Sequence, residues 1–89
     1  MKVIQLNIAG IGDVELREPS LKAVRPFLSM MGTDTQGFML EVLNVSVYQD
    51  GDQVKDVDEL IGLSTLSELI PKITELLGFD NEDAEPGND

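Results

Sequence analysis

The sequence contains no histidine, cysteine or tryptophan, and only 4% of its residues are aromatic. The absence of histidine and cysteine excludes zinc fingers, iron–sulfur ligation, disulfide scaffolds, cysteine nucleophiles and every histidine-based catalytic triad. The shortage of aromatic side chains argues against a platform on which nucleic-acid bases stack. An enzyme and a nucleic-acid-binding protein are therefore the least favoured classes.

Basic residues are also scarce, with 6 Lys and Arg against 17 Asp and Glu, a net charge of −11 and a pI of about 4.1. Such a chain repels phosphate backbones and anionic lipid surfaces. No apolar run approaches the roughly 18 residues of a membrane-spanning helix. The alternating first residues lack the apolar segment of a signal peptide. We therefore expect a cytoplasmic protein that binds neither nucleic acid nor membrane.

What is present is a hydrophobic fraction of 42%, which is typical of a folded globule. The length of 89 residues fits one domain. We expect this single small domain to span residues 1–79. Residues 80–89 contain five acidic residues, one proline and no basic residue, and predict a disordered acidic tail. Setting the tail aside takes the net charge from −11 to −6, so the predicted domain is itself acidic.

The beginning of the chain predicts a β-hairpin from Val3 to Arg17. Apolar and polar residues alternate on both sides of residues 10–13, whose glycines and aspartate favour a turn. An isolated hairpin is marginal in water, so we expect its apolar face to pack on helices. The alternation places on that face Ile4, Leu6, Ile8, Val14 and Leu16.

Three to four short helices are predicted to follow, which makes the fold class α+β, and mainly α. The first begins after Ser20, whose hydroxyl can cap it, and is kinked or ends early at Pro26. A loop over residues 32–36 comes next. A further short helix is predicted to open at residues 56–59 and to end at Gly62.

The last helix carries an apolar stripe with a 3.6-residue period. Thr65 and Glu68 fit a capping box at its start, which places Pro71 within the second turn from the cap. Gly78 is a natural stop at its end. The stripe consists of Leu66, Leu69, Ile70, Ile73, Leu76 and Leu77.

Residues 37–48 are apolar at eight of twelve positions. We predict a helix to about Val45, while the alternation of apolar and polar residues over 43–48 leaves a strand as the alternative. The Asp50-Gly51 dipeptide then predicts a turn.

A helix that is apolar over most of its circumference must be buried on more than one side. It is either a central core helix or partly a surface that meets another protein. The hypothesis of a partner-binding surface names Met30, Met31, Phe38, Met39, Leu43 and Val47, because flexible methionines suit binders of varied partners.

No motif for catalysis, a cofactor or a metal is found. An EF-hand loop beginning at Asp50 would need an oxygen ligand at Val54, glycine at Lys55 and glutamate at Ile61. The phosphopantetheine attachment motif of acyl carrier proteins is also incomplete, because no aspartate precedes Ser64. No acidic pair is placed in an apolar pocket that would suit general acid–base work. We therefore predict no catalytic residue, no cofactor and no metal.

The order of these signals resembles the small tail assembly chaperones of long-tailed bacteriophages and prophages. The resemblance covers about residues 3–79 and rests on layout and short motifs. These are Leu16-Arg17-Glu18-Pro19-Ser20-Leu21-Lys22 after the β segment, the apolar helix from Phe38 to Val47, the Asp50-Gly51 turn, and the run from Val57 to Leu66 that leads into the last helix.

The resemblance implies a non-enzymatic role in the bacterial host cytoplasm. Such chaperones bind the long, helical tape measure protein and keep it soluble until tail tube subunits polymerise around it. The family commonly makes a longer form by translational frameshift, and its extension is thought to recruit the tube protein. This chain resembles the short form. The open edge of the hairpin leaves a homo-oligomer as a further alternative.

A second hypothesis is an acidic phage or plasmid inhibitor that mimics nucleic acid through its charge. It would use the acidic residues of 50–59 and of the tail, which together hold 10 of the 17 carboxylates. Some other protein-interaction module is the third alternative. Strong salt dependence of partner binding favours the inhibitor, whereas apolar binding survives higher salt.

Overall fold

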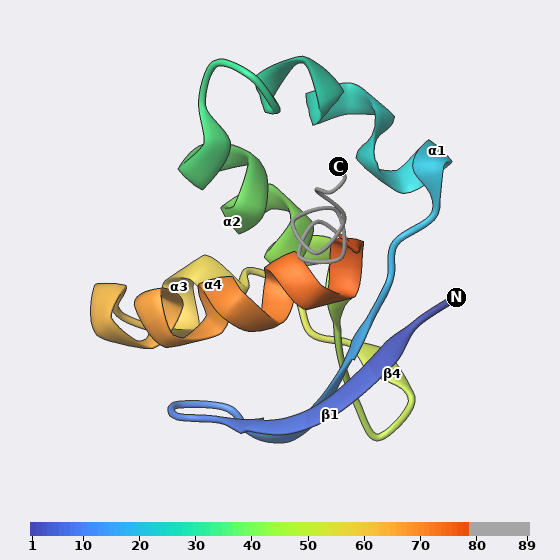
Figure 1. Ribbon diagram of the computed structural model, residues 1–89. Coiled ribbons are helices and arrows are strands. Elements are labelled where there is room, and N and C mark those ends of the chain that lie inside the picture. Colours follow the sequence, from blue (N-terminus) through green and yellow to red (C-terminus); the bar gives the residue numbers. More distant parts are fainter. Residues whose placement is uncertain (79–89) are drawn as a thin grey trace, which may run out of the picture.

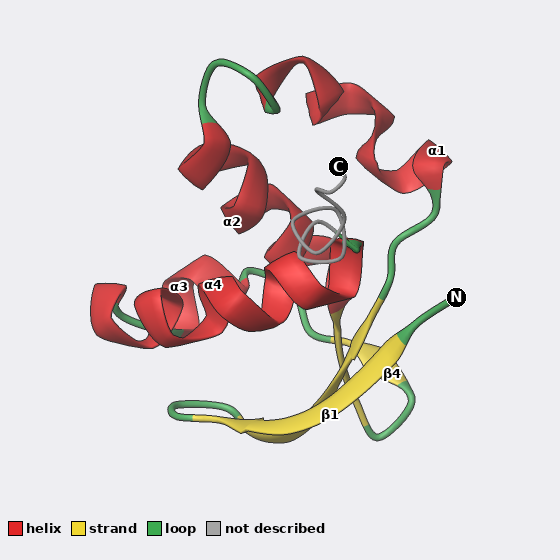
Figure 2. Cartoon of the chain, viewed as in Figure 1, coloured by secondary structure: helices red, strands yellow, loops and turns green. Residues whose placement is uncertain are grey.

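A computed structural model describes residues 1–78 as an α+β fold, in which helices lie on one face of a four-stranded antiparallel sheet (Figures 1 and 2). The predicted fold class is confirmed, and the predicted tail lies outside the described residues. The strands are β1 (Val3–Ile8), β2 (Gly12–Arg17), β3 (Val47–Gln49) and β4 (Asp52–Gln53), in the sheet order β1-β2-β3-β4. The helices are α1 (Leu21–Val24), the 3-10 helix η1 (Arg25–Met30), α2 (Thr35–Ser46), α3 (Val57–Leu60) and α4 (Leu63–Leu77).

The N-terminal hairpin forms as predicted. Ile4 lies opposite Leu16, and Leu6 lies opposite Val14, so the apolar side chains of both strands share one face. Leu16 is fully buried there, while Ile4 and Leu6 on the outer strand are half-buried. Helices α2 and α4 pack on this face, α2 against β2 and α4 against β1.

The first helical segment is short because of its proline. The Ser20 hydroxyl caps α1 by accepting a hydrogen bond from the N–H of Ala23 at 3.2 Å, as predicted. The α-helix ends at Val24, and the chain continues as the tighter η1 with Pro26 near its start. Phe27 leaves helical geometry altogether, at φ −123° and ψ 17°. This confirms the early end and kink that a proline without a backbone N–H imposes.

Helix α2 begins two residues earlier than predicted. The Asp34 carboxylate accepts a hydrogen bond from the N–H of Gly37 at 3.0 Å and so caps the helix at Thr35. Thr35 and Gln36 are therefore helical, and the predicted loop over residues 32–36 is wrong for these two. The helix ends at Ser46, one residue beyond the prediction, and passes directly into β3.

The sheet has two strands more than the predicted hairpin. The predicted Asp50-Gly51 turn joins β3 to β4, and both of its residues have positive φ (55° and 87°), as a two-residue type I′ turn requires. Val47 lies opposite Leu16, which extends the hairpin into one sheet. The strand alternative for residues 43–48 holds only from Val47 onward.

Helix α4 begins earlier than its predicted capping box. The structure starts the helix at Leu63, and the N–H of Leu66 donates to the carbonyl of Gly62 at 3.1 Å. Thr65 therefore lies inside the helix, and the predicted capping box is wrong. The helix begins with backbone hydrogen bonds and not with a side-chain cap. Pro71 consequently lies near the middle of α4 and not in its second turn. Gly78 ends the helix at φ 81°, as predicted.

The core lies between the sheet and the two long helices. Leu43 of α2 and Ile73 of α4 are 0% and 1% exposed, and Val57 of α3 closes the core beside them. The Lys2 ammonium donates a hydrogen bond to the carbonyl of Glu75 at 2.6 Å. A cation at the C-terminal end of a helix is favourable, and this one fastens α4 to the start of β1.

Candidate functional site

Four of the six residues predicted to bind a partner are buried in the core. Phe38, Met39, Leu43 and Val47 are between 0% and 7% exposed. All four belong to the hydrophobic core: the first three lie on α2, which contacts β2, α3 and α4, and Val47 begins β3. The central-core interpretation of this helix is therefore correct, and an exposed surface made of these four residues is excluded for the chain in this conformation.

The two methionines of the same hypothesis lie elsewhere. Met30 is half-buried at the end of η1 and packs against the core, while Met31, the next residue, is 42% exposed. A single exposed residue of this kind is ordinary on a protein surface. The six predicted residues thus do not form one accessible site.

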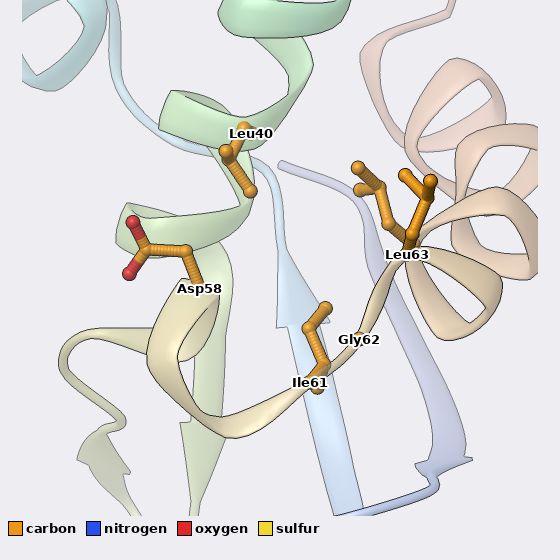
Figure 3. A pocket seen from close by; sticks show the side chains of 6 residues that line it. Leu40, Asp58, Ile61, Gly62 and Leu63 are labelled. Atoms are coloured by element: carbon orange, nitrogen blue, oxygen red, sulfur yellow. The ribbon is translucent and has the colours of Figure 1, made fainter.

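The most exposed leucine of the described chain lies at a different place, the junction of α3 and α4. Leu63, the first residue of α4, is 81% exposed, and Leu60 at the end of α3 is 48% exposed. Beside Leu63 lies a hollow of about 190 Å³ (Figure 3). In Figure 3, Leu40 of α2 and Ile61 of the connection point toward each other across it, with Leu63 on the far side. Its lining consists of Leu40, Asp58, Ile61, Gly62, Leu63 and Leu66.

A second hollow of about 250 Å³ continues from the first along α4. It is lined by Gln36 of α2 and by four residues of α4, and it shares Leu63 and Leu66 with the first hollow. The two together form a groove between the N-terminal halves of α2 and α4. We name it the α2–α4 groove and define it by the apolar residues Leu40, Ile61, Leu63, Leu66 and Ile70.

The spacing of apolar residues along α4 explains the groove. Leu69, Ile73 and Leu76 point into the core and are buried. Leu63, Leu66 and Ile70 follow the i, i+3, i+7 pattern of a second, adjacent stripe. Leu66 and Ile70 are half-buried and pack against the core, whereas Leu63 is exposed, so α4 carries apolar surface that its own fold leaves uncovered.

The charge at the rim of the groove is acidic. Asp58 is exposed and lines the first hollow, and its backbone N–H donates to the Asn44 side chain at 3.3 Å, which ties α3 to α2. Neither hollow has a lysine or arginine in its lining. An apolar floor beside a carboxylate suits an apolar segment flanked by basic residues.

The predicted acidic stretch lies on a solvated surface. Asp50 lies in the β3–β4 turn and Asp52 follows it, while Asp56, Asp58 and Glu59 lie at α3, and all five are exposed. Within residues 1–78, no three acidic side chains come close enough together to hold a metal ion.

A third hollow lies beside Arg17 and Tyr48, and the Arg17 side chain in its lining already interacts with neighbouring residues. The Arg17 guanidinium lies 4.2 Å from the Tyr48 ring centre and 3.0 Å from the Glu15 carboxylate.

No protein-family model, curated protein or solved structure gives a significant match to this chain. The resemblance to tail assembly chaperones therefore stays a prediction from the sequence. In the part of the chain that the structure describes, the helices are too short or too polar to cross a membrane.

Sequence reasoning missed the groove because it began α4 too late. With a start at Thr65, Leu63 falls in a connection and the adjacent stripe loses its first member. The signal was present, since Leu63, Leu66 and Ile70 share one helical face once the helix begins at Leu63.

Proposed function

We propose that this protein is a phage tail assembly chaperone that binds the tape measure protein through the α2–α4 groove. The observation that carries the proposal is Leu63, 81% exposed beside two connected apolar hollows. A large apolar side chain held in water next to an apolar groove is typical of a protein-binding site. The sequence resemblance supplies the kind of partner.

The groove fits an amphipathic helix as its occupant. A helix that lays its apolar face in a groove presents anchors at i, i+3 or i+4, and i+7. The tape measure proteins of this family are long and helical, and their apolar stripes would aggregate without a cover. The net charge of −11 on the chaperone keeps such a complex soluble.

On this proposal a gene for a tape measure protein lies beside the gene of this chain, and Leu63→Asp tests the groove in cells that co-express the two proteins. The exposed side chain contributes little to the fold, so the variant stays folded. We expect the wild-type protein to hold the tape measure protein in the soluble fraction and to co-purify with it. Leu63→Asp loses both effects, because a carboxylate would be buried against apolar surface.

Leu21→Asp is the matched control. Leu21 is a leucine of similar exposure, 66%, and it belongs to α1, outside the groove. The control retains wild-type solubilisation and co-purification. Equal losses in both variants would point to a general effect of added charge, and wild-type behaviour of Leu63→Asp would exclude the groove.

Salt separates this proposal from the nucleic-acid mimic. A complex held by apolar burial persists when NaCl rises from about 0.1 M to 1 M, where the Debye length falls from about 10 Å to 3 Å. A mimic that uses Asp50, Asp52, Asp56, Asp58 and Glu59 dissociates over this range. Asp50→Asn with Asp52→Asn, at exposed positions outside the groove lining, weakens the mimic and leaves binding in the groove nearly unchanged.

A further inference from the structure

Strand β1 forms an open edge of the sheet. The sheet order β1-β2-β3-β4 gives β1 a single neighbour, β2. The N–H of Glu18 donates to the carbonyl of Lys2 at 2.8 Å. This bond shows which residues of β1 direct their backbone groups toward β2. In an antiparallel ladder, pairs that exchange hydrogen bonds alternate with pairs that do not. Because Lys2 and Glu18 form a hydrogen-bonded pair, Ile4 and Leu6 also direct their backbone groups toward β2. The backbone N–H and C=O groups of the alternate residues Val3, Gln5 and Asn7 point outward.

The two edges of the sheet are protected very differently. The opposite edge, β4, is only two residues long, begins with Asp52 and follows the acidic turn. Short, charged edge strands resist pairing with other chains. Strand β1 is six residues long, and its sequence Val-Ile-Gln-Leu-Asn-Ile contains no charge, no proline and no glycine. Within residues 1–78, no hydrogen bond from another segment covers its outer side.

We propose that the outer edge of β1 binds β1 of a second copy of this chain, antiparallel, with the two-fold axis at Gln5. This register places Gln5 opposite Gln5 of the second copy, and Val3 opposite its Asn7. All three residues direct their backbone groups outward, so every facing pair can exchange hydrogen bonds. The two sheets then join into one of eight strands, independently of the proposed chaperone function.

The side chains favour a second copy over an unrelated strand. On the helix-covered face, Ile4 lies opposite Leu6 of the second copy, and both of these side chains are half-buried in the single chain. Pairing covers the apolar area that an edge strand leaves open. On the other face, exposed Gln5 meets its own counterpart, and two uncharged amides can hydrogen-bond. The edge is therefore complementary to itself, as a two-fold interface requires.

Charge predicts how the association responds to salt. Each copy carries a net charge of −11, so like charges oppose the dimer, although β1 itself is neutral. Salt screens this repulsion. The dimer therefore becomes tighter between about 20 mM and 300 mM NaCl, the reverse of an association held by ion pairs.

Gln5→Pro, studied by sedimentation equilibrium, tests the edge. Proline removes one outward N–H that the single chain does not use, and edge strands tolerate it where that N–H faces solvent. We expect the wild-type protein to dimerise reversibly, and Gln5→Pro to raise the dissociation constant by about tenfold or more. The matched control Gln5→Thr keeps the N–H and the strand propensity and dimerises like the wild type.

Two results overturn the proposal. One is a wild-type protein that stays monomeric up to about 1 mM, where the standard binding free energy would be only about 4 kcal/mol. The other is a Gln5→Pro protein that is folded by circular dichroism and dimerises as well as Gln5→Thr. If Gln5→Pro does not fold, single-cysteine variants decide the question.

The chain has no cysteine, so one introduced thiol reports on the register. In the proposed dimer, position 5 faces its own counterpart at a Cα separation of about 5.5 Å, within the range of a disulfide. Position 7 lies on the same face of the same strand, but it is four residues, or about 14 Å at 3.4 Å per residue, from its counterpart along the strand. We expect rapid disulfide-linked dimer from Gln5→Cys and little from Asn7→Cys. Equal yields from the two variants overturn the register and the proposal.

Discussion

Gly10 lies directly against the backbone carbonyl of Leu60: a Cβ atom on Gly10 would be 2.7 Å from that oxygen. The contact joins the turn of the first hairpin to the end of α3. Gly10 also has a φ of 97°, a conformation that side chains disfavour. This glycine is thus required both by the local turn and by the approach of a distant segment.

Gly10→Ala is therefore expected to lower the free energy of unfolding by about 1–3 kcal/mol. The loss combines backbone strain with displacement of Leu60. Urea denaturation gives the change, with Tyr48, the single tyrosine of a chain without tryptophan, as the fluorescent probe. Gly32→Ala is the control, because a Cβ there meets nothing within 4 Å. Equal stability of the two variants would contradict this account.

Leu43→Ala and Leu63→Ala remove the same atoms from opposite environments. Leu43 is 0% exposed and Leu63 is 81% exposed. Truncating the buried leucine leaves a cavity and costs about 2–5 kcal/mol. Truncating the exposed one changes stability by about 0.5 kcal/mol or less. Thermal unfolding by circular dichroism separates the two, and a large loss from Leu63→Ala would mean that the groove is part of the core.

Pro71→Ala is expected to make the protein more stable. Pro71 is exposed near the middle of α4 and cannot donate a backbone hydrogen bond to the preceding turn. Alanine in a helix interior is favoured over proline by about 3 kcal/mol, of which we expect about 1–3 kcal/mol to be recovered. The measurement is the midpoint of guanidinium denaturation. The control is Ser67→Ala, at another exposed position of α4, which raises the free energy of unfolding by a few tenths of a kcal/mol at most. A Pro71→Ala variant with the stability of the wild type would refute the prediction.

Asp34 is expected to stabilise α2 as its cap. Asp34→Ala loses the hydrogen bond to the N–H of Gly37 and costs about 1 kcal/mol. Asp34→Ser can still accept that bond and keeps most of the stability. Both changes are measured by chemical denaturation at neutral pH. An alanine variant as stable as the serine variant would show that the cap contributes nothing.

The parts of the fold that local sequence determines were predictable. Alternation placed Leu6 and Val14 on one face of the hairpin, and Pro26 ended α1 because it has no backbone N–H to donate. Strand β3 was foreseen only as the alternative over residues 43–48, and β4 was not predicted, although the Asp50-Gly51 turn between them was. Three and two residues are too few for periodicity, and these strands exist because Val47 pairs with Leu16 from far away in the sequence.

The candidate site was harder to predict, because exposure depends on the completed packing. The apolar composition of residues 37–48 indicated a helix in need of cover, and the sheet with α4 supplies that cover. The surplus apolar surface lies instead on α4. Recognising this surface required knowing where α4 begins. Backbone hydrogen bonding to Gly62 sets that start, whereas the sequence pattern of a capping box indicated a later one.

The direct passage from α2 into β3 has a mechanical consequence. Ser46 ends the helix and Val47 begins the strand, with no linker between them, and both residues are buried. Neither element can open while the other stays in place, so the helical layer and the sheet belong to one cooperative unit. Amide hydrogens of Val42 and Val47 should exchange with the same free energy, that of global unfolding, while α1 and η1 exchange more readily.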